Sequence, residues 1–313
     1  MGTPQLAARI LEILLTAPPI HSQVVAVVSR PDQPRGRGLR LESSEVDVLA
    51  RAHNLPVLKP TKIRTAEFVA ELKSFAPDLL VIAAYGRILP SEVLGVARII
   101  PLNVHASLLP KFRGASPVEA AILAGESESG VTIMRVTERM DAGPILLQRI
   151  LPIASDETQG SLKAKLAEMG GAALIEALAL LRRGELAETE QDDGLATYTS
   201  PIKKEDAIID WQDDAQLIER RVRAYDPWPV ARTRIATDEL LVWRARVISL
   251  YEAGIESATA SAGTLVKAKP APIVQCGQGL LQLIEVQAPG RRRMAAEEFM
   301  RGRRVAEGVS LRG

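Results

Sequence analysis

The chain has 313 residues, 47% of them hydrophobic and 25% charged, and its formal net charge is +1. This composition is typical of a globular protein that is long enough for two domains. The small net charge excludes bulk electrostatic attraction to nucleic acid, so such a partner must be held by local basic patches. The single cysteine, Cys276, excludes an intramolecular disulfide and, with only three histidines, argues against a structural zinc site. No apolar run approaches membrane-spanning length, so we expect a cytoplasmic protein and take a monomer as the default.

The first 83 residues alternate between helical and strand patterns. Thr3, as a cap, and Pro4, at the first helical position, predict a helix that begins almost at the start. The later segments are strands at 24–28, 56–58 and 79–83 and helices at 46–52 and 66–73. Alternation of this kind favours parallel strands joined by crossover helices. We therefore predict an α/β fold with a Rossmann-like, mostly parallel sheet and flanking helices.

A basic segment at 29–40 interrupts this alternation. It contains four arginines, two prolines and two glycines, a composition that predicts an exposed irregular loop rather than a regular element. The loop is either an ordinary solvated connection or an arm that contacts phosphate groups, because a guanidinium matches phosphate oxygens.

The stretch 102–117, LNVHASLLPKFRGASP, runs from a buried strand into a loop. Successive side chains of a strand alternate between its faces, so Asn103 and His105 project to the same side. In an open parallel sheet, ligands bind beyond the carboxyl ends of the strands, where this junction would lie. A lone histidine is nevertheless more often structural than catalytic.

Two more turns follow predicted strands. The pair Tyr85-Gly86 follows the apolar strand at 79–83, and Asp141 lies in a Met-Asp-Ala-Gly-Pro turn after a predicted strand at 130–136. Each is by itself compatible with an ordinary turn. Apolar walls with a few placed polar groups are also what a flat heterocyclic ligand needs.

The second half of the chain differs in pattern. A long helix is predicted at 158–183 and a polar linker at 184–193, after which short strands punctuated by Gly and Pro dominate. A small β-barrel of the oligonucleotide/oligosaccharide-binding (OB) type, packed with a helix at 215–224, fits this pattern. Its basic residues would form a discontinuous basic face, with Arg220, Arg221, Arg223, Lys267, Lys269 and Arg291, Arg292 and Arg293.

The stretch 102–117 closely resembles the signature of folate-dependent formyltransferases, which move a formyl group from 10-formyltetrahydrofolate to an amine. The resemblance implies that Asn103, His105 and Asp141 are catalytic and that no metal is needed. In this family a buried parallel strand precedes the turn at 2–4, so the first strand of the sheet is expected to be missing here. The residues that the resemblance implies for folate binding are Ser107, Leu108, Leu109, Pro110, Tyr85, Gly86 and Ile88.

The basic segment and the second half are similar to those family members that formylate initiator methionyl-tRNA for translation initiation. Gly36-Arg37-Gly38, Ile209–Trp211 and Asp226–Pro229 carry this similarity. It implies a catalytic domain at 1–184, a linker at 185–204 and an OB-like tRNA-binding domain at 205–313. The implied tRNA-binding residues are Arg35, Arg37, Arg40, Arg220, Arg223, Lys267 and Arg291.

Two alternatives stay open. In the first, the chain acts on another amine, such as a sugar amine, as other folate-dependent formyltransferases do. In the second, it is a catalytically silent RNA-binding protein that keeps Asn103, His105 and Asp141. The first alternative predicts transfer to a different acceptor, and the second predicts tRNA binding without transfer.

Overall fold

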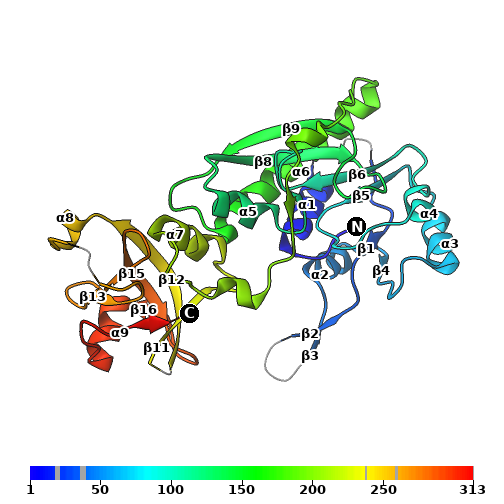
Figure 1. The fold of residues 1–313 in the computed structure, drawn as a ribbon. Coiled ribbons are helices and arrows are strands. Elements are labelled where there is room, and N and C mark those ends of the chain that lie inside the picture. Colours follow the sequence, from blue (N-terminus) through cyan, green and yellow to red (C-terminus); the bar gives the residue numbers. More distant parts are fainter. Residues whose placement is uncertain (18–21, 36–39, 237, 258–259, 313) are drawn as a thin grey trace. The chain divides into compact units, whose positions relative to one another are not determined.

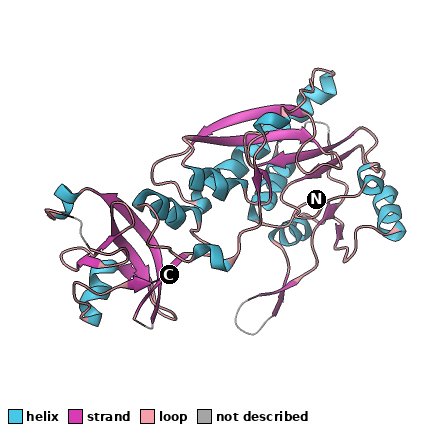
Figure 2. Ribbon diagram, in the orientation of Figure 1, coloured by secondary structure: helices cyan, strands magenta, loops and turns pink. Residues whose placement is uncertain are grey.

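The computed structural model describes all residues except 18–21, 36–39, 237, 258–259 and 313. The chain forms two compact units. Unit 1 consists of Met1–Pro117, Ser127–Pro152 and Leu162–Ser200, and unit 2 consists of Val118–Glu126, Ile153–Ser161 and Pro201–Gly313. Helices and strands alternate along most of unit 1, whereas strands dominate unit 2 (Figure 2).

Unit 1 is an α/β structure, as predicted. Its helices are α1 (Gln5–Thr16), α2 (Glu45–Ala52), α3 (Ala66–Ser74), α4 (Ser91–Leu94) and most of α6 (Gln159–Arg183). Its strands are β1 (Val27–Val28), β2 (Gln33–Arg35), β3 (Arg40–Glu42), β4 (Val57–Leu58), β5 (Leu79–Ile82), β6 (Ile100–His105), β7 (Arg113–Gly114), β8 (Glu128–Arg135), β9 (Ile145–Pro152) and β10 (Tyr198–Thr199).

The central sheet of unit 1 has the strand order β5-β6-β8-β9 (Figure 1). Strand β5 pairs with β6 in parallel, and β1 likewise pairs with β4. Strand β8 runs antiparallel to both β6 and β9. The short turn between β8 and β9 allows only antiparallel pairing, because a parallel connection needs a crossover of a dozen or more residues.

Helix α6 packs closely against this part of the unit. A Cβ added at Gly170 would lie 3.0 Å from Val104 Cγ1 of β6, and one added at Gly171 would lie 2.9 Å from Ile13 Cβ of α1. The two glycines weaken the helix intrinsically by about 1 kcal/mol each relative to alanine. Their lack of side chains lets α6 approach both the sheet and α1.

The start of the chain lies between β1 and β5. Gly2 N donates to Val28 O at 3.0 Å, and Met1 O accepts from Ala83 N at 2.9 Å. These two residues therefore bridge the neighbouring strands, and a cavity of about 460 Å³ lies beside them, lined by α1 and by 22–28 and 79–81 among others. The predicted Thr3 cap is wrong, because Pro4 is the N-cap residue of α1 and makes no side-chain capping bond.

The basic segment is more regular than expected. Strands β2 and β3 pair antiparallel, with Gln33 opposite Glu42 and Arg35 opposite Arg40, so the prediction of an irregular loop is wrong for these residues. The ladder bonds of a two-stranded ribbon supply the order that the composition does not indicate. The residues between the strands, including Arg37 and the Gly-Arg-Gly motif, lie outside the described residues.

Unit 2 contains the predicted barrel-like antiparallel sheet. The strand order is β13-β14-β15-β12-β11-β17, and a bridge between Thr264 and Ser310 brings the two ends of this path together. The strands are β11 (Ala231–Ile235), β12 (Asp238–Ile248), β13 (Leu265–Lys267), β14 (Ile273–Gln275), β15 (Leu280–Gln287), β16 (Met294–Ala295) and β17 (Leu311–Arg312). The helices are α5 (Pro117–Ala124, whose first residue belongs to unit 1), α7 (Ala215–Ala224), α8 (Leu250–Ala253) and α9 (Ala296–Arg303).

A buried apolar core holds unit 2 together. Trp211 and Ile218 are buried against strand residues such as Val242, Leu281 and Val286. The indole N–H of Trp211 donates to Thr233 Oγ1 at 2.9 Å, so its polar atom is satisfied inside the core.

Candidate active site

Strand β6 presents two polar side chains at its carboxyl end. Leu102 and Val104 are buried, and Asn103, between them in sequence, is half-buried. His105 is only 6% exposed and lies two residues beyond Asn103. The alternation of a strand therefore places the amide and the imidazole on one side, as predicted.

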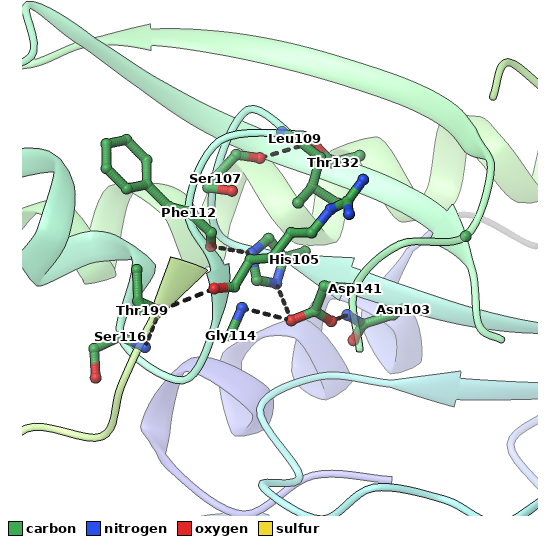
Figure 3. A network of polar contacts seen from close by, with 12 residues as sticks. Asn103, His105, Ser107, Leu109, Phe112, Gly114, Ser116, Thr132, Asp141 and Thr199 are labelled. Carbon is green, nitrogen blue, oxygen red and sulfur yellow. Dashed lines mark hydrogen bonds and ion pairs between the residues drawn. The ribbon is translucent and has the colours of Figure 1, made fainter. Parts of the chain in front are cut away.

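Asp141, from the turn after β8, meets both side chains (Figure 3). Its Oδ1 accepts from Asn103 Nδ2 at 3.4 Å, and its Oδ2 lies 3.7 Å from His105 Nδ1. The backbone N–H of Gly114 donates to Oδ2 at 2.9 Å. The structure thus brings together the amide, the imidazole and the carboxylate that the sequence singles out.

The contacts of His105 define what its two ring nitrogens can do. Nε2 lies 3.0 Å from Phe112 O, and a carbonyl oxygen only accepts, so Nε2 carries a hydrogen. Nδ1 faces the Asp141 carboxylate. A proton taken up by Nδ1 would therefore be stabilised by a negative charge, which is the arrangement that general acid–base chemistry needs.

The loop after β6 is held by β8. Thr132 Oγ1 donates to Ser107 O at 2.7 Å and accepts from Leu109 N at 3.1 Å. Ser107 Oγ donates to Lys111 O at 2.7 Å, so its hydroxyl serves the loop rather than a nucleophilic role. Ser107 and Leu109 are buried, and Leu108 and Pro110 are half-buried.

The turn after β5 exposes backbone more than side chains. The Tyr85 side chain is 1% exposed and packs in an apolar cluster, and this burial raises the pKa of its phenol. Arg30 Nε donates to Tyr85 O at 3.1 Å, and another nitrogen of the same guanidinium donates to Gly86 O. The side chain of Ile88 is 61% exposed. A ligand at this turn would meet Ile88 and main-chain groups, not the ring of Tyr85.

Family models cover both units of this chain. The Formyl transferase model matches residues 1–178, and the model described as Formyl transferase, C-terminal domain, matches residues 201–304. The chain belongs to the formyl transferase family.

Curated relatives extend along nearly the whole of this formyl transferase. A methionyl-tRNA formyltransferase of Methylococcus capsulatus is 42% identical over 97% of this chain and 96% of its own length. A methionyl-tRNA formyltransferase of Pseudomonas fluorescens is 44% identical over 97% of this chain and 92% of its own length.

Among solved structures, an N-formyltransferase of Helicobacter canadensis, in complex with folinic acid and dTDP-3-aminofucose, matches with a TM-score of 0.63. That match has 18% identity and covers 92% of this chain and 97% of the other, so it shows the fold alone.

Sequence reasoning missed two residues of this formyl transferase, Arg113 and Gln191, which adjoin the residues of the site. Arg113 is fully buried, and its Nε and Nη2 donate to Gln191 Oε1 at 3.0 and 2.8 Å. Gln191 lies in the stretch predicted as a linker, yet residues up to Ser200 belong to unit 1, and β10 pairs with β7. Residues 189–199 are thus tied to unit 1 by backbone and side-chain bonds. The polar residues that suggested a linker either make these bonds or face solvent. Gln191 is part of no helical or strand periodicity, so no sequence signal identifies it.

The predicted basic residues of this formyl transferase are spread over several elements. Arg35 and Arg40 lie in the β2–β3 hairpin, which projects from unit 1 (Figure 1). In unit 2, Arg223 pairs with Glu219 at 2.6 Å, and Lys267 Nζ donates to Ala253 O at 2.6 Å. Arg220, also on α7, is half-buried, and Arg291 is exposed in the turn after β15. Arg223 and Lys267 are therefore engaged within the unit, whereas Arg291 faces solvent.

Two features are absent from the described part of the chain. No group of three or more His, Cys, Asp or Glu side chains there is arranged to hold a metal ion. None of the described helices is both long enough and apolar enough to cross a membrane.

Proposed function

We propose that this formyl transferase moves the formyl group of 10-formyltetrahydrofolate to the amino group of methionine on initiator methionyl-tRNA, for translation initiation. The observation that carries the proposal is the convergence of Asn103, His105 and Asp141 in a chain 42–44% identical to named methionyl-tRNA formyltransferases. The proposed setting is the cytoplasm, and the proposed state is a monomer.

The transfer requires these side chains to stabilise an oxyanion, to remove a proton from the attacking amine and to deliver a proton to N10 of the folate. The amine nitrogen attacks the formyl carbon, and the carbonyl oxygen becomes an oxyanion. The bond from that carbon to N10 of the folate then breaks as the carbonyl reforms. One proton leaves the attacking nitrogen and one reaches N10, so the formyl group exchanges one nitrogen for another without any redox step.

Asn103 is the proposed oxyanion donor. Its Nδ2 carries two hydrogens, and the contact with Asp141 Oδ1 uses only one of them. The second is available to the formyl oxygen, and a preorganised donor of this kind lowers a barrier by about 3 kcal/mol.

His105 and Asp141 are the proposed proton-handling pair. Protonated at Nδ1, His105 is stabilised by Asp141 Oδ2. The carboxylate is itself held by the N–H of Gly114, so it is oriented before substrate arrives. We propose that this pair takes the proton from the amine, through water where needed, and returns one to N10.

The folate site is proposed at the turn after β5 and the loop after β6. Backbone groups at Gly86 and the exposed side chain of Ile88 fit one wall for a flat heterocycle. The loop formed by Ser107, Leu108, Leu109 and Pro110 fits the other, because Thr132 fixes it. Tyr85 contributes through its main chain, and Arg30, which holds the carbonyls of Tyr85 and Gly86, keeps the turn in shape.

The tRNA is proposed to be held by the β2–β3 hairpin and by basic side chains of unit 2. Arg35, Arg37 and Arg40 belong to the basic segment at 29–40, and Arg220, Arg223, Lys267 and Arg291 belong to unit 2. Of the unit 2 residues, Arg291 is the best placed to meet phosphate, since it is exposed.

The test is transfer of labelled formyl from 10-formyltetrahydrofolate to charged initiator tRNA, with elongator methionyl-tRNA and an amino-sugar nucleotide as competing acceptors. Formyl on initiator methionyl-tRNA alone is the expected result. Formyl on the sugar amine would replace the proposed acceptor with another amine. Binding of tRNA without transfer to any acceptor would identify a silent RNA-binding protein and overturn the proposal.

A further inference from the structure

The turn that carries Asp141 has an unfavourable backbone conformation. Asp141 has a φ of +48°, in the left-handed region that non-glycine residues rarely occupy. A Cβ added at Gly143, in the same turn, would lie 2.0 Å from Arg135 O, so the turn lies directly against the end of β8. Such a conformation persists only where surrounding groups hold it.

Gln191 supplies that support through both halves of its amide. Its Nε2 donates to Asp141 O at 3.0 Å and to Gly143 O at 2.7 Å. Its Oε1 accepts both N–H groups from Arg113. The orientation of the amide is therefore fixed, since only its nitrogen can face the two carbonyls and only its oxygen can face the guanidinium.

Arg113 connects this amide to the contacts of the catalytic side chains. Its neighbours in sequence are Phe112, whose carbonyl meets His105 Nε2, and Gly114, whose N–H meets the Asp141 carboxylate. The buried guanidinium also pairs with Asp193 at 2.8 Å, two residues after Gln191. The Gln191–Arg113 pair thus joins the loop that orients His105 to the turn that carries Asp141.

We propose that Gln191 is a positioning residue for formyl transfer: it fixes the backbone of the Asp141 turn and, through Arg113, the distance between Asp141 and His105. It acts through these residues and touches no reacting atom. This inference rests on the proposed function, because it assigns Gln191 a part in that same reaction.

The deciding variant is Gln191→Glu, which keeps the size of the side chain and an acceptor for Arg113. A carboxylate has no N–H for the carbonyls of Asp141 and Gly143, so the turn loses its support. We expect kcat for methionyl-tRNA to fall roughly 10- to 100-fold, the range in which small misplacements of reacting groups act. KM values for folate and tRNA should stay within about twofold, and the pH profile of kcat should shift because the Asp141–His105 distance changes.

Gln275→Glu is the matched control. Gln275, in unit 2, is a buried glutamine whose Nε2, like that of Gln191, donates to two backbone carbonyls, those of Cys276 at 2.8 Å and Gly279 at 3.3 Å. We expect it to lower the melting temperature but to leave kcat and its pH profile unchanged.

Three outcomes are distinguishable. An inactive wild-type chain with intact tRNA binding would sink the proposed function itself. An active wild type with normal kcat and pH profile in Gln191→Glu would overturn the positioning role alone. If Gln191→Glu lost only folded protein, with normal kcat per folded molecule, the residue would be structural and the inference would also fail.

Discussion

The surroundings of Asp141 in unit 1 and the basic side chains of unit 2 are organised in opposite ways. Around Asp141, groups from β6, β7 and residues 189–199 converge on one carboxylate and the turn that carries it. In unit 2, Arg223 pairs with Glu219 on its own helix, while Arg291 faces solvent in a turn. The partners that converge on Asp141 hold its carboxylate in place before substrate binds. The number of basic residues in unit 2, by contrast, does not show which of them can contact phosphate. The first arrangement predicts large, local effects of mutation, and the second predicts small, graded ones.

The largest effect is expected from Asp141→Asn. The change removes the negative charge that faces His105 Nδ1 and leaves a side chain of the same shape. Loss of this general acid–base function should lower kcat by about 10²- to 10⁴-fold. Rapid-quench formyl transfer would measure the loss, and circular dichroism would check folding. A variant with near-normal kcat would remove Asp141 from the reaction.

The next effect is expected from Arg113→Met and is on stability. The fully buried guanidinium gives Gln191 Oε1 both of its hydrogen bonds, so methionine leaves that oxygen without a donor. Hydrogen bonds from a charged group contribute about 2 kcal/mol, so their loss should be measurable as a lower free energy of unfolding in urea. The Asp193 carboxylate that this change leaves without Arg113 is 55% exposed, so water can solvate it and the lost ion pair should add little.

Arg139→Met is the matched control for that change. Arg139 pairs with the other oxygen of Asp193 but is exposed. A smaller loss of unfolding free energy is expected, because water can replace an exposed pair. Equal losses in the two variants would mean that the ion pair, rather than the bonds to Gln191, stabilises this region.

The sequence predicts a good part of this organisation. Periodicity gives most of the helices of unit 1 and the β6 strand, and alternation along β6 places Asn103 and His105 together. Asp141 comes from the family resemblance, since by itself it reads as a turn residue. The pairing of β8 with β6 and the contacts of Gln191 could not be predicted, because they join residues far apart in the chain and leave no local periodic signal. The β2–β3 ribbon was hidden for a related reason: its order comes from pairing rather than from the propensity of Pro and Gly.

A graded effect is expected for the basic residues of unit 2. Arg291→Ala should weaken tRNA binding and make the dependence of log affinity on log salt shallower by about 1, as loss of one phosphate contact does. Arg223→Ala should change that slope less, because its guanidinium is shared with Glu219 and Glu157 O. Fluorescence binding titrations over a range of salt concentrations would measure both. Equal slopes for Arg291→Ala and wild type would remove Arg291 from the interface.

The smallest effect is expected at Cys276, which lies in the core of unit 2. Burial raises the pKa of its thiol to about 12, so at pH 8 the group stays protonated and is a poor nucleophile. The native protein should therefore resist iodoacetamide at pH 8 and react only when unfolded, as mass spectrometry would show. Cys276→Ala should leave kcat and both KM values unchanged, although it loses some packing in the core. Rapid labelling of Cys276 in the folded chain, together with loss of formyl transfer, would mean that unit 2 holds a reactive group that the reaction needs. Unit 2 would then no longer differ from the Asp141 site in the way described above.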